Sequence, residues 1–344
     1  SYRKQVIIFL IGSISLLVRC KISGTKIGVL LGYGNGTFSE PILSFVDDLV
    51  MHMQNIVTDL NNDQISDIVV INTGLGYIYI LYGNGDGTFV VKTNILLEEN
   101  FELRKISVAD VNGDDYKDIV VTSTNLDGFI VCYGNVDGSF IEITTSDIQT
   151  SYIPFAINVN DFNNDNFMDI AFVNSDSNTI DVFLGYGNGS FETKKTSPTG
   201  GVLASQYMIV GDFNEDEILD LIVMQPLVSS LNVIFGYGNG SFGDKIKLIL
   251  LSNLGSLDIN LVTLVDFNRD NHLDVVVCQG NPCVMFIFYG DGNGSFERDI
   301  IFPTKRFNNY RSISTGDLDG DGYSGIITSF NYTLEILFNT GQCT

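Results

Sequence analysis

Five short segments of the chain place oxygen-bearing side chains at the same positions of a nine-residue pattern. Each begins with Asp, followed by Asn at the third position and Asp at the fifth and ninth. Carboxylate and amide oxygens are hard donors that suit Ca²⁺, whereas zinc and copper favour His or Cys. Mg²⁺ would require a tighter octahedron and keep more waters. The pattern therefore predicts calcium sites.

A backbone carbonyl at the seventh position would add a further oxygen to each site. Asp and Asn also favour turns without metal, but that alternative does not explain four positions repeated five times. Three carboxylates in one turn repel each other, and a divalent cation cancels the repulsion. The five predicted donor sets are Asp59, Asn61, Asp63, Ile65 and Asp67; Asp110, Asn112, Asp114, Tyr116 and Asp118; Asp161, Asn163, Asp165, Phe167 and Asp169; Asp212, Asn214, Asp216, Ile218 and Asp220; and Asp266, Asn268, Asp270, His272 and Asp274.

A sixth loop departs from the pattern at its end. Gly325 stands where the last Asp would be, so we expect weaker calcium binding there. The sixth position of these loops favours Gly or Asn because its backbone is left-handed. Gln64 and Glu217 occupy that position in two loops, which predicts strain. The donors of the sixth loop are Asp317, Asp319, Asp321 and the carbonyl of Tyr323.

Both the acidic loops and a glycine-rich string recur with one period. The acidic loops begin 51 residues apart, with one spacing of 54, and strings such as GYGNGTF keep the same phase. The three extra residues lie between Phe242 and Asp266. The first residues of the acidic loops are Asp59, Asp110, Asp161, Asp212, Asp266 and Asp317, and the strings end at Phe38, Phe89, Phe140, Phe191, Phe242 and Phe296.

Each repeat is expected to contain four short strands. In one repeat these are 106–109, 119–122, 129–133 and 140–143, and no segment has the 3.6-residue period of a helix. Four strands per unit of this length are typical of propeller blades. The sequence thus predicts an all-β fold, a β-propeller with four-stranded blades. A β-sandwich is the alternative, but it would not require a strict period.

Seven blades are predicted if the N-terminal segment forms a degenerate first blade. Its acidic loop would fall at residues 8–16, which are apolar and could not bind metal. Six blades with an N-terminal remnant is the alternative. The Phe that begins the outer strand of the last blade would fall beyond the last residue, so that blade is expected to lack its outer strand. We treat 1–344 as a single propeller domain, in which residues 1–26 are the degenerate blade or a segment resembling a signal peptide, basic and then apolar.

Composition excludes several classes of partner. The net charge of −23 leaves no basic face for nucleic acid or for anionic membranes, and no membrane insertion is evident. Three acids in each of the six loops, eighteen of the 41, occupy predicted ligand positions. Five cysteines leave at least one without a partner in the chain. Cys278 and Cys283 flank a turn and could form a hairpin disulfide, with buried thiols as the alternative.

The glycine-rich strings could be mistaken for phosphate-binding loops, which require a following helix. Here a strand follows, so a tight hairpin is expected. The strings also create N-G-[ST] sequons at Asn35, Asn188, Asn239 and Asn293, but the turn itself selects those residues. Asn331 is the better glycosylation candidate.

The blocks DVNGDDYKDIVV and DFNRDNHLDVVV, with the string FGYGNGSF, resemble FG-GAP (VCBS-type) repeats, the blades of integrin-α-like propellers. The resemblance covers about residues 27–338. It implies calcium in the loop between the first two strands of each blade, an extracellular location (secreted or cell surface), and a role in adhesion or ligand binding. No stalk or inserted domain of an integrin is visible.

We expect a protein or glycan ligand on the face opposite the acidic loops, which carries loops such as 72–76 and 174–179 and the connectors between blades. The basic connector 305–311 could meet an acidic partner. We do not expect an enzyme, because catalysis requires an acid, base or nucleophile outside the metal loops. The chain has only two histidines, and one of them, His272, lies in an acidic loop. The alternatives are a lyase or hydrolase on a propeller, or a spacer domain of a larger secreted protein.

Overall fold

The computed structural model describes most of the chain, and every regular element in it is a β-strand. The expected absence of helix holds throughout these ranges, so none of them contains a helix that could span a membrane. The described residues are 6–11, 26–45, 53–72, 76–97, 102–124, 128–146, 154–174, 177–199, 207–225, 230–249, 257–279, 284–303, 310–330 and 333–341.

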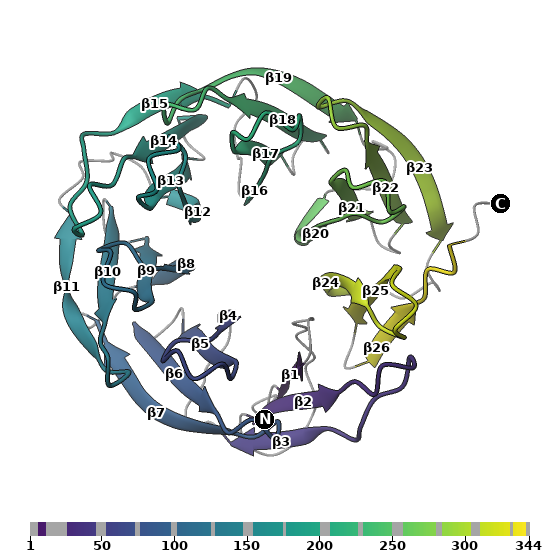
Figure 1. Ribbon diagram of the computed structural model, residues 1–344, viewed down its shortest axis with the longest axis horizontal. Coiled ribbons are helices and arrows are strands. Elements are labelled where there is room, and N and C mark those ends of the chain that lie inside the picture. Colours follow the sequence, from purple (N-terminus) through teal and green to yellow (C-terminus); the bar gives the residue numbers. More distant parts are fainter. Residues whose placement is uncertain are drawn as a thin grey trace.

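The strands form seven sheets arranged around a central opening, which is the architecture of a β-propeller (Figure 1). In each sheet of four, the first strand lies nearest the centre and the fourth forms the outer wall. The sheets are β1 (Val6–Ile11), β2 (Lys26–Leu31) and β3 (Ile42–Phe45); β4 (Met53–Thr58), β5 (Asp67–Asn72), β6 (Tyr77–Gly83) and β7 (Phe89–Leu96); β8 (Leu103–Ala109), β9 (Asp118–Ser123), β10 (Phe129–Gly134) and β11 (Phe140–Ser146); β12 (Pro154–Asn160), β13 (Asp169–Asn174), β14 (Thr179–Phe183) and β15 (Lys195–Pro198); β16 (Tyr207–Gly211), β17 (Asp220–Gln225), β18 (Ser230–Gly236) and β19 (Phe242–Ile249); β20 (Leu257–Val265), β21 (Asp274–Gln279), β22 (Val284–Gly290) and β23 (Phe296–Pro303); and β24 (Tyr310–Asp317), β25 (Ser324–Phe330) and β26 (Thr333–Leu337).

Six of the sheets are antiparallel meanders, and the N-terminal sheet is built differently. Its strands β1 and β2 pair in parallel, Val6 opposite Lys26, whereas every pair in the other sheets is antiparallel. Parallel neighbours cannot be joined by a tight turn. The prediction of seven blades, with the N-terminal segment as a degenerate first blade, is therefore not supported. The alternative count, six repeat blades with an N-terminal remnant beside them, describes the structure better.

The second strand of each blade is a continuous apolar run. The strand β5 has the sequence DIVVIN, and all six of its side chains are buried. Such a run is expected where both faces of a strand are covered, because a half-exposed strand would alternate apolar and polar residues. Each sheet stands face to face with its neighbours in the ring, which covers both faces.

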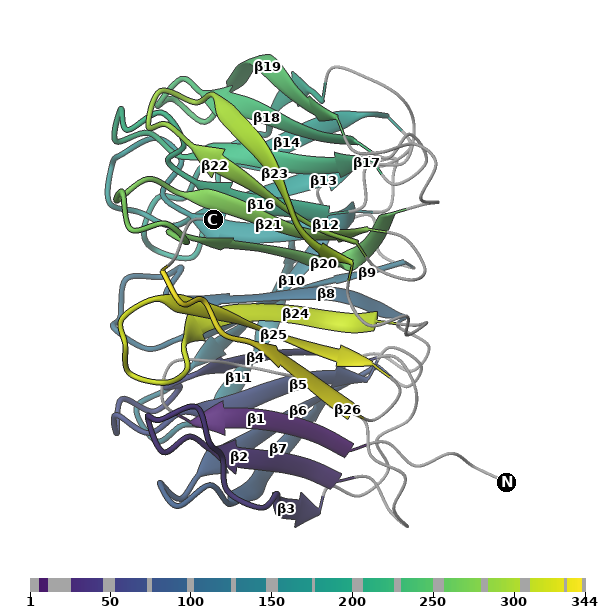
Figure 2. The same cartoon turned by 90° about the vertical axis from the view of Figure 1, so that its right-hand side faces the viewer.

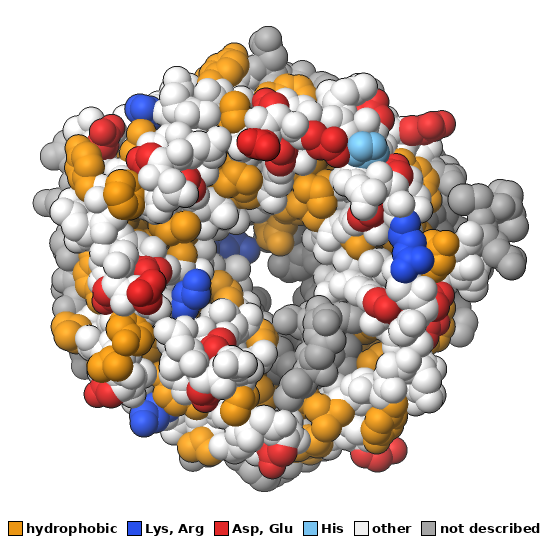
Figure 3. All heavy atoms as spheres, in the orientation of Figure 1, with side chains coloured by type: hydrophobic (Ala, Val, Ile, Leu, Met, Phe, Trp, Pro, Cys, Tyr) orange, Lys and Arg blue, Asp and Glu red, His pale blue; other side chains and the backbone are white. Residues whose placement is uncertain are grey.

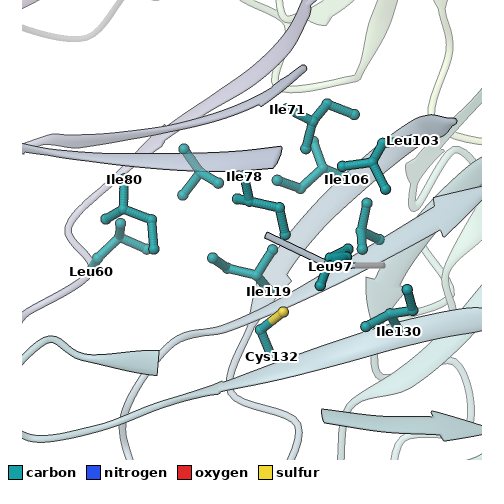
Figure 4. Close-up of a cluster of buried hydrophobic side chains, with 12 residues drawn as sticks. Leu60, Ile71, Ile78, Ile80, Leu97, Leu103, Ile106, Ile119, Ile130 and Cys132 are labelled. Atoms are coloured by element: carbon teal, nitrogen blue, oxygen red, sulfur yellow. The ribbon is translucent and has the colours of Figure 1, made fainter. Parts of the chain in front are cut away.

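The hydrophobic core consequently lies between blades. In one cluster, Ile78 and Ile80 of one blade pack against Ile119 and Ile130 of the next (Figure 4). Leu60, the second residue of an acidic loop, joins the same cluster and is 2% exposed. The loops are thus anchored in the core that holds adjacent blades together.

The N-terminal sheet closes the ring. Ile27 and Val29 pack on the β4–β7 blade, and Leu30 packs against Leu318 and Ile327 of the last sheet. That last sheet has three strands among the described residues, as expected for a blade without its outer strand. A side view shows strands running between two faces of the ring (Figure 2).

Two cysteines fall in described strands. Cys278, near the end of β21, is disulfide-bonded, and its partner lies outside the described residues. The pairing of Cys278 with Cys283 stays a prediction. Cys132 is buried between blades. The glycosylation candidate Asn331 also lies outside the described residues, as does most of the basic connector 305–311.

Candidate metal centres

All six acidic loops connect the first and second strands of a blade and lie on one face of the ring. The glycine-rich turns between third and fourth strands share that face, because the N–H of Gly189 in one such turn donates to the carbonyl of Val111 beside an acidic loop. Figure 3 shows this face, with Asp and Glu side chains spread around the ring. The arrangement expected from strand direction is therefore present.

The Asp at the ninth position is held by two backbone amides. Asp67 accepts the N–H of Leu60 at Oδ2 and that of Gly83 at Oδ1, both at 2.9 Å. All five such carboxylates are fully buried, and burial raises the pKa of each to about 6. This Asp therefore ties the acidic loop to the end of the third strand. The same pair of bonds is made by Asp118, Asp169, Asp220 and Asp274.

The Asp at the first position folds the loop around itself. Asp161 accepts the N–H of Asp165 at Oδ1 (3.1 Å) and that of Asn166 at Oδ2 (2.7 Å). The fourth and sixth residues adopt left-handed backbone, with φ of 58° at Asn164 and 68° at Asn166. The left-handed conformation of these two residues directs the consecutive N–H groups of Asp165 and Asn166 toward the Asp161 carboxylate. Asx residues tolerate this conformation better than most side chains.

Two loops pay a conformational cost at the sixth position. Gln64 has a φ of 67° and Glu217 a φ of 65°, so both adopt the left-handed conformation that disfavours long side chains. The left-handed backbone expected at this position is confirmed for both residues. The bond from the sixth N–H to the first Asp is still made in both loops, at 2.7 Å from Gln64 and 2.9 Å from Glu217.

The third and fifth positions meet inside the loop. The Asn163 amide nitrogen donates to Asp165 Oδ2 at 2.8 Å, and Asp165 Oδ1 accepts the N–H of Phe167 at 2.8 Å. Since Asp161 binds Asp165 as well, positions one, three and five lie together. The Asp side chain at the ninth position is instead directed into the buried interior of the blade, toward the two backbone amides that it accepts. The four predicted side-chain donors are therefore not equivalent.

The sixth loop holds the tightest group of carboxylates. Within the described residues, three carboxylates come within 4.8 Å of one another only at Asp317, Asp319 and Asp321. The third position is Asp here, where the other loops have Asn. The ninth position, Gly325, lacks the buried carboxylate that anchors the other loops. The sequence showed both substitutions, but it treated Gly325 as a lost metal donor and not as a lost anchor.

The donors of all six loops fit a hard divalent cation. Carboxylate and amide oxygens at positions one, three and five are gathered in each loop, and position seven offers its carbonyl. The His272 ring does not compete for that role, because Nδ1 contacts Glu215 Oε1 of the preceding loop at 2.5 Å. This contact raises the pKa of His272. When bound, Ca²⁺ would be held by these oxygens and would neutralise the crowded carboxylates.

Neighbouring acidic loops also bind one another, which the sequence analysis missed. Asn62 Nδ2 donates to the carbonyl of Asp115 at 3.0 Å, and Arg269 Nε donates to that of Gly322 at 2.8 Å. In both cases the fourth residue of one loop reaches the sixth residue of the next. The Arg269 guanidinium also lies 4.1 Å from the centre of the Tyr323 ring. The recurrence of Asn at the fourth position of the acidic loops was the sequence feature that could have predicted these contacts.

The comparisons with known proteins agree with this construction. The model of the FG-GAP-like repeat matches residues 59–121, 110–172, 161–223, 212–277 and 266–328, most of the chain. The chain belongs to the FG-GAP-like repeat family. Each match begins at the first Asp of an acidic loop and runs through the second strand of the next blade. No curated protein matches the chain.

Solved structures share the propeller fold of this FG-GAP-like protein at low identity. A lectin from Agrocybe aegerita, described as recognising non-reducing terminal N-acetylglucosamine, superposes with a TM-score of 0.67 and 18% identity over 91% of this chain and 85% of the lectin. BBS1N, solved in complex with ARL6DN, gives a TM-score of 0.55 and 13% identity over 88% of this chain and 83% of that chain. The chain is thus an FG-GAP propeller with a lectin among its structural neighbours.

Proposed function

We propose that this protein is an extracellular calcium-binding propeller that acts as a ligand-binding or adhesion module. The carrying observation is the repeated loop frame, in which positions one, three and five are gathered by the same hydrogen bonds in successive blades. Ca²⁺ in these loops is structural, because each loop is anchored in an inter-blade core through residues such as Leu60. We propose five complete sites and a sixth, at Asp317, with a different balance of charge and anchoring.

Metal analysis of the purified protein tests the calcium proposal. We expect five or six Ca²⁺ ions per chain, and a melting temperature that falls when a chelator is added. A ligand bound only by the folded state stabilises that state by about 2.7 kcal/mol per site at 100 times its Kd. A melting temperature that does not change with chelator would overturn the structural role of the ions.

We further propose that the ligand is a glycan or a protein bound on the face opposite the acidic loops. The lectin neighbour supports a glycan, and the metal loops leave that face free for recognition. A glycan array probed with and without calcium tests it. If calcium supports ligand binding only by stabilising the fold, binding should persist in the presence of chelator at temperatures below the unfolding temperature of the metal-free protein. Absence of any glycan hit, with capture of a defined cell-surface protein, would favour the protein ligand.

We propose a binding module and not an enzyme. The described histidine, His272, contacts Glu215 on the acidic face and belongs to the loop contacts described above. Turnover of glycan or ester substrates that survives substitution of the metal-loop aspartates would contradict this.

A further inference from the structure

Lys105 and Tyr207 meet although they belong to blades that are not adjacent. Lys105 lies on β8 and Tyr207 on β16, and the β12–β15 blade separates their sheets. Both strands are the innermost of their blades and border the central opening (Figure 1). The Lys105 ammonium is nonetheless 5.3 Å from the centre of the Tyr207 ring. The pair therefore spans the inner edge of the intervening blade.

The register of the strands explains how this contact is possible. Ala109, Asn160 and Gly211 each pair with the buried Asp that begins the second strand. Counting back four residues from each gives Lys105, Ala156 and Tyr207, so these three occupy equivalent positions. On the intervening blade this position is Ala156, which is buried in the core shared with the β16–β19 blade.

Gln54 occupies the same position in the preceding blade. Thr58 pairs with Asp67 there, and Gln54 Oε1 accepts the N–H of Ile106 at 3.1 Å. Gln54, Lys105, Ala156 and Tyr207 thus form a layer at one level of the channel wall, called the channel layer below. The opening that they border is visible at the centre of Figure 3, with Lys or Arg side-chain atoms at its wall.

Lys105 has no acidic partner among the described side chains, although acids outnumber basic residues 41 to 18 in the chain. Burial and the neighbouring Arg104 lower the pKa of its ammonium. A partly buried cation without a counter-ion is unfavourable, and an aromatic ring compensates only part of the cost. Among the side chains that the structure describes, the positive charge of the channel layer is therefore uncompensated.

Lys105 lies nearer to the face opposite the acidic loops than to the loops themselves. The strand β8 runs from Leu103 to Ala109, immediately before the acidic loop at Asp110. Lys105 is near its beginning and hence toward the other face. An anion that enters from that face reaches the ammonium before it meets the ring of acidic loops. Arg104, exposed beside Lys105, adds positive potential at this end.

We propose that the channel layer binds the carboxylate of a small ligand that enters the central channel from the face opposite the acidic loops. The Lys105 ammonium is the counter-ion, the Tyr207 ring bounds one side, and Gln54 contributes an amide. One ammonium matches the single charge of a carboxylate. The carboxylate comes from an acidic sugar or from a free organic acid. The sugar version rests on the proposed glycan-binding function, and the organic-acid version does not.

Calorimetric titration of the full chain with glucuronate, propionate, glucose and inorganic phosphate tests the proposal. We expect glucuronate or propionate to bind, and glucose and phosphate to bind at least ten-fold more weakly. Glucuronate tighter than propionate by ten-fold or more identifies an acidic sugar; the reverse identifies an organic acid. If neither carboxylate binds the wild-type protein, or if phosphate binds more tightly than both, the proposal is wrong.

Matched variants assign the binding to this site. Lys105→Met keeps the length of the stem and removes the charge, and should weaken carboxylate binding at least ten-fold. Lys105→Arg keeps the charge and should retain most of it. Lys92→Met is the control, because Lys92 also lies over a tyrosine ring, that of Tyr82, at 5.9 Å, but on the exposed outer strand β7. It should bind like the wild type.

The outcomes separate this site from the proposed function. Equal carboxylate binding by Lys105→Met, with an unchanged melting temperature, overturns the channel site. If that variant is unstable, Tyr207→Phe and Lys105→Arg are titrated instead. A loss of carboxylate binding that is greater in Lys105→Arg than in Lys92→Met counts against a site that depends on charge alone. Glycan-array signals unchanged in Lys105→Met leave glycan recognition intact without the channel. Propionate binding that requires Lys105, with no glycan hits, leaves the channel site intact and removes glycan recognition.

Discussion

The N–H of Gly36 donates to the carbonyl oxygen of Leu318 at 3.1 Å, although 282 residues separate them in the chain. Gly36 lies in the turn of the N-terminal sheet and Leu318 in the last acidic loop. Gly189 makes the same bond to Val111 between two adjacent repeat blades, at 3.2 Å. The N-terminal sheet therefore docks on the last blade as the β12–β15 blade docks on the one before it, in spite of its parallel strands.

A backbone contact at this seam should be sensitive to a single methyl group. A Cβ at Gly320 would lie 2.7 Å from the Gly34 carbonyl oxygen, whereas a Cβ at Gly34 would meet nothing within 4 Å. Both glycines have positive φ, 79° and 71°. We expect Gly34→Ala to cost about 1 kcal/mol through its backbone conformation, and Gly320→Ala to cost about 1–2 kcal/mol more through contact. Urea unfolding of the two variants measures the difference; equal losses would show that the seam relaxes.

The ninth and fifth aspartates of a loop should respond differently to substitution. Asp169→Asn places an amide N–H against one of the two backbone donors, Phe162 or Gly185, in a buried site. We expect a loss of about 1–3 kcal/mol even without calcium. Asp165→Asn, in the exposed part of the same loop, should instead bind one Ca²⁺ fewer with a small effect on the metal-free protein. Unfolding curves with and without chelator, together with metal analysis, distinguish the two.

The buried aspartates predict opposite pH dependence for metal-free and calcium-loaded protein. Burial raises the folded-state pKa of Asp67 and its four counterparts to about 6, above the unfolded value of 3.8. The folded state therefore binds more protons between these values, so the metal-free protein gains stability as the pH falls from 7 toward 4.5. The calcium-loaded protein should lose stability over that interval, because protons compete with the ion. Denaturant midpoints at pH 7 and 5 test both slopes, and parallel slopes would contradict the interpretation.

The contact between the last two loops should contribute measurably to the ring. Arg269→Met removes the hydrogen bond to the Gly322 carbonyl and the cation beside the Tyr323 ring, while keeping much of the apolar stem. We expect a loss of about 1–2 kcal/mol, since one charged hydrogen bond and one partly exposed cation–π contact are removed. The exposed Lys92→Met serves as the control and should change stability by less than about 0.5 kcal/mol. Thermal unfolding of both variants is the measurement.

The repeat, the strand content and the location of the acidic loops followed from the sequence alone. A 51-residue period in two separate motifs defines the repeat and its six acidic loops, but it did not decide whether the N-terminal segment forms a further blade. Continuous apolar runs such as that of β5 indicate strands covered on both faces. Left-handed backbone at Gln64 was also predictable, since the loop requires it whatever the residue type.

The tertiary structure decided what depends on contacts between repeats. The pattern of four donors did not show that the buried Asp67 carboxylate accepts hydrogen bonds from two backbone amides. One of these amides, that of Gly83, is 16 residues away in the chain. Nor could it show that β1 would pair in parallel with β2, since an apolar segment is compatible with either direction. The approach of Lys105 to Tyr207 depends on the curvature of the ring, which brings innermost strands together across the blade between them. Sequence periodicity specifies each blade and its loops; closure of the ring determines which of their side chains meet.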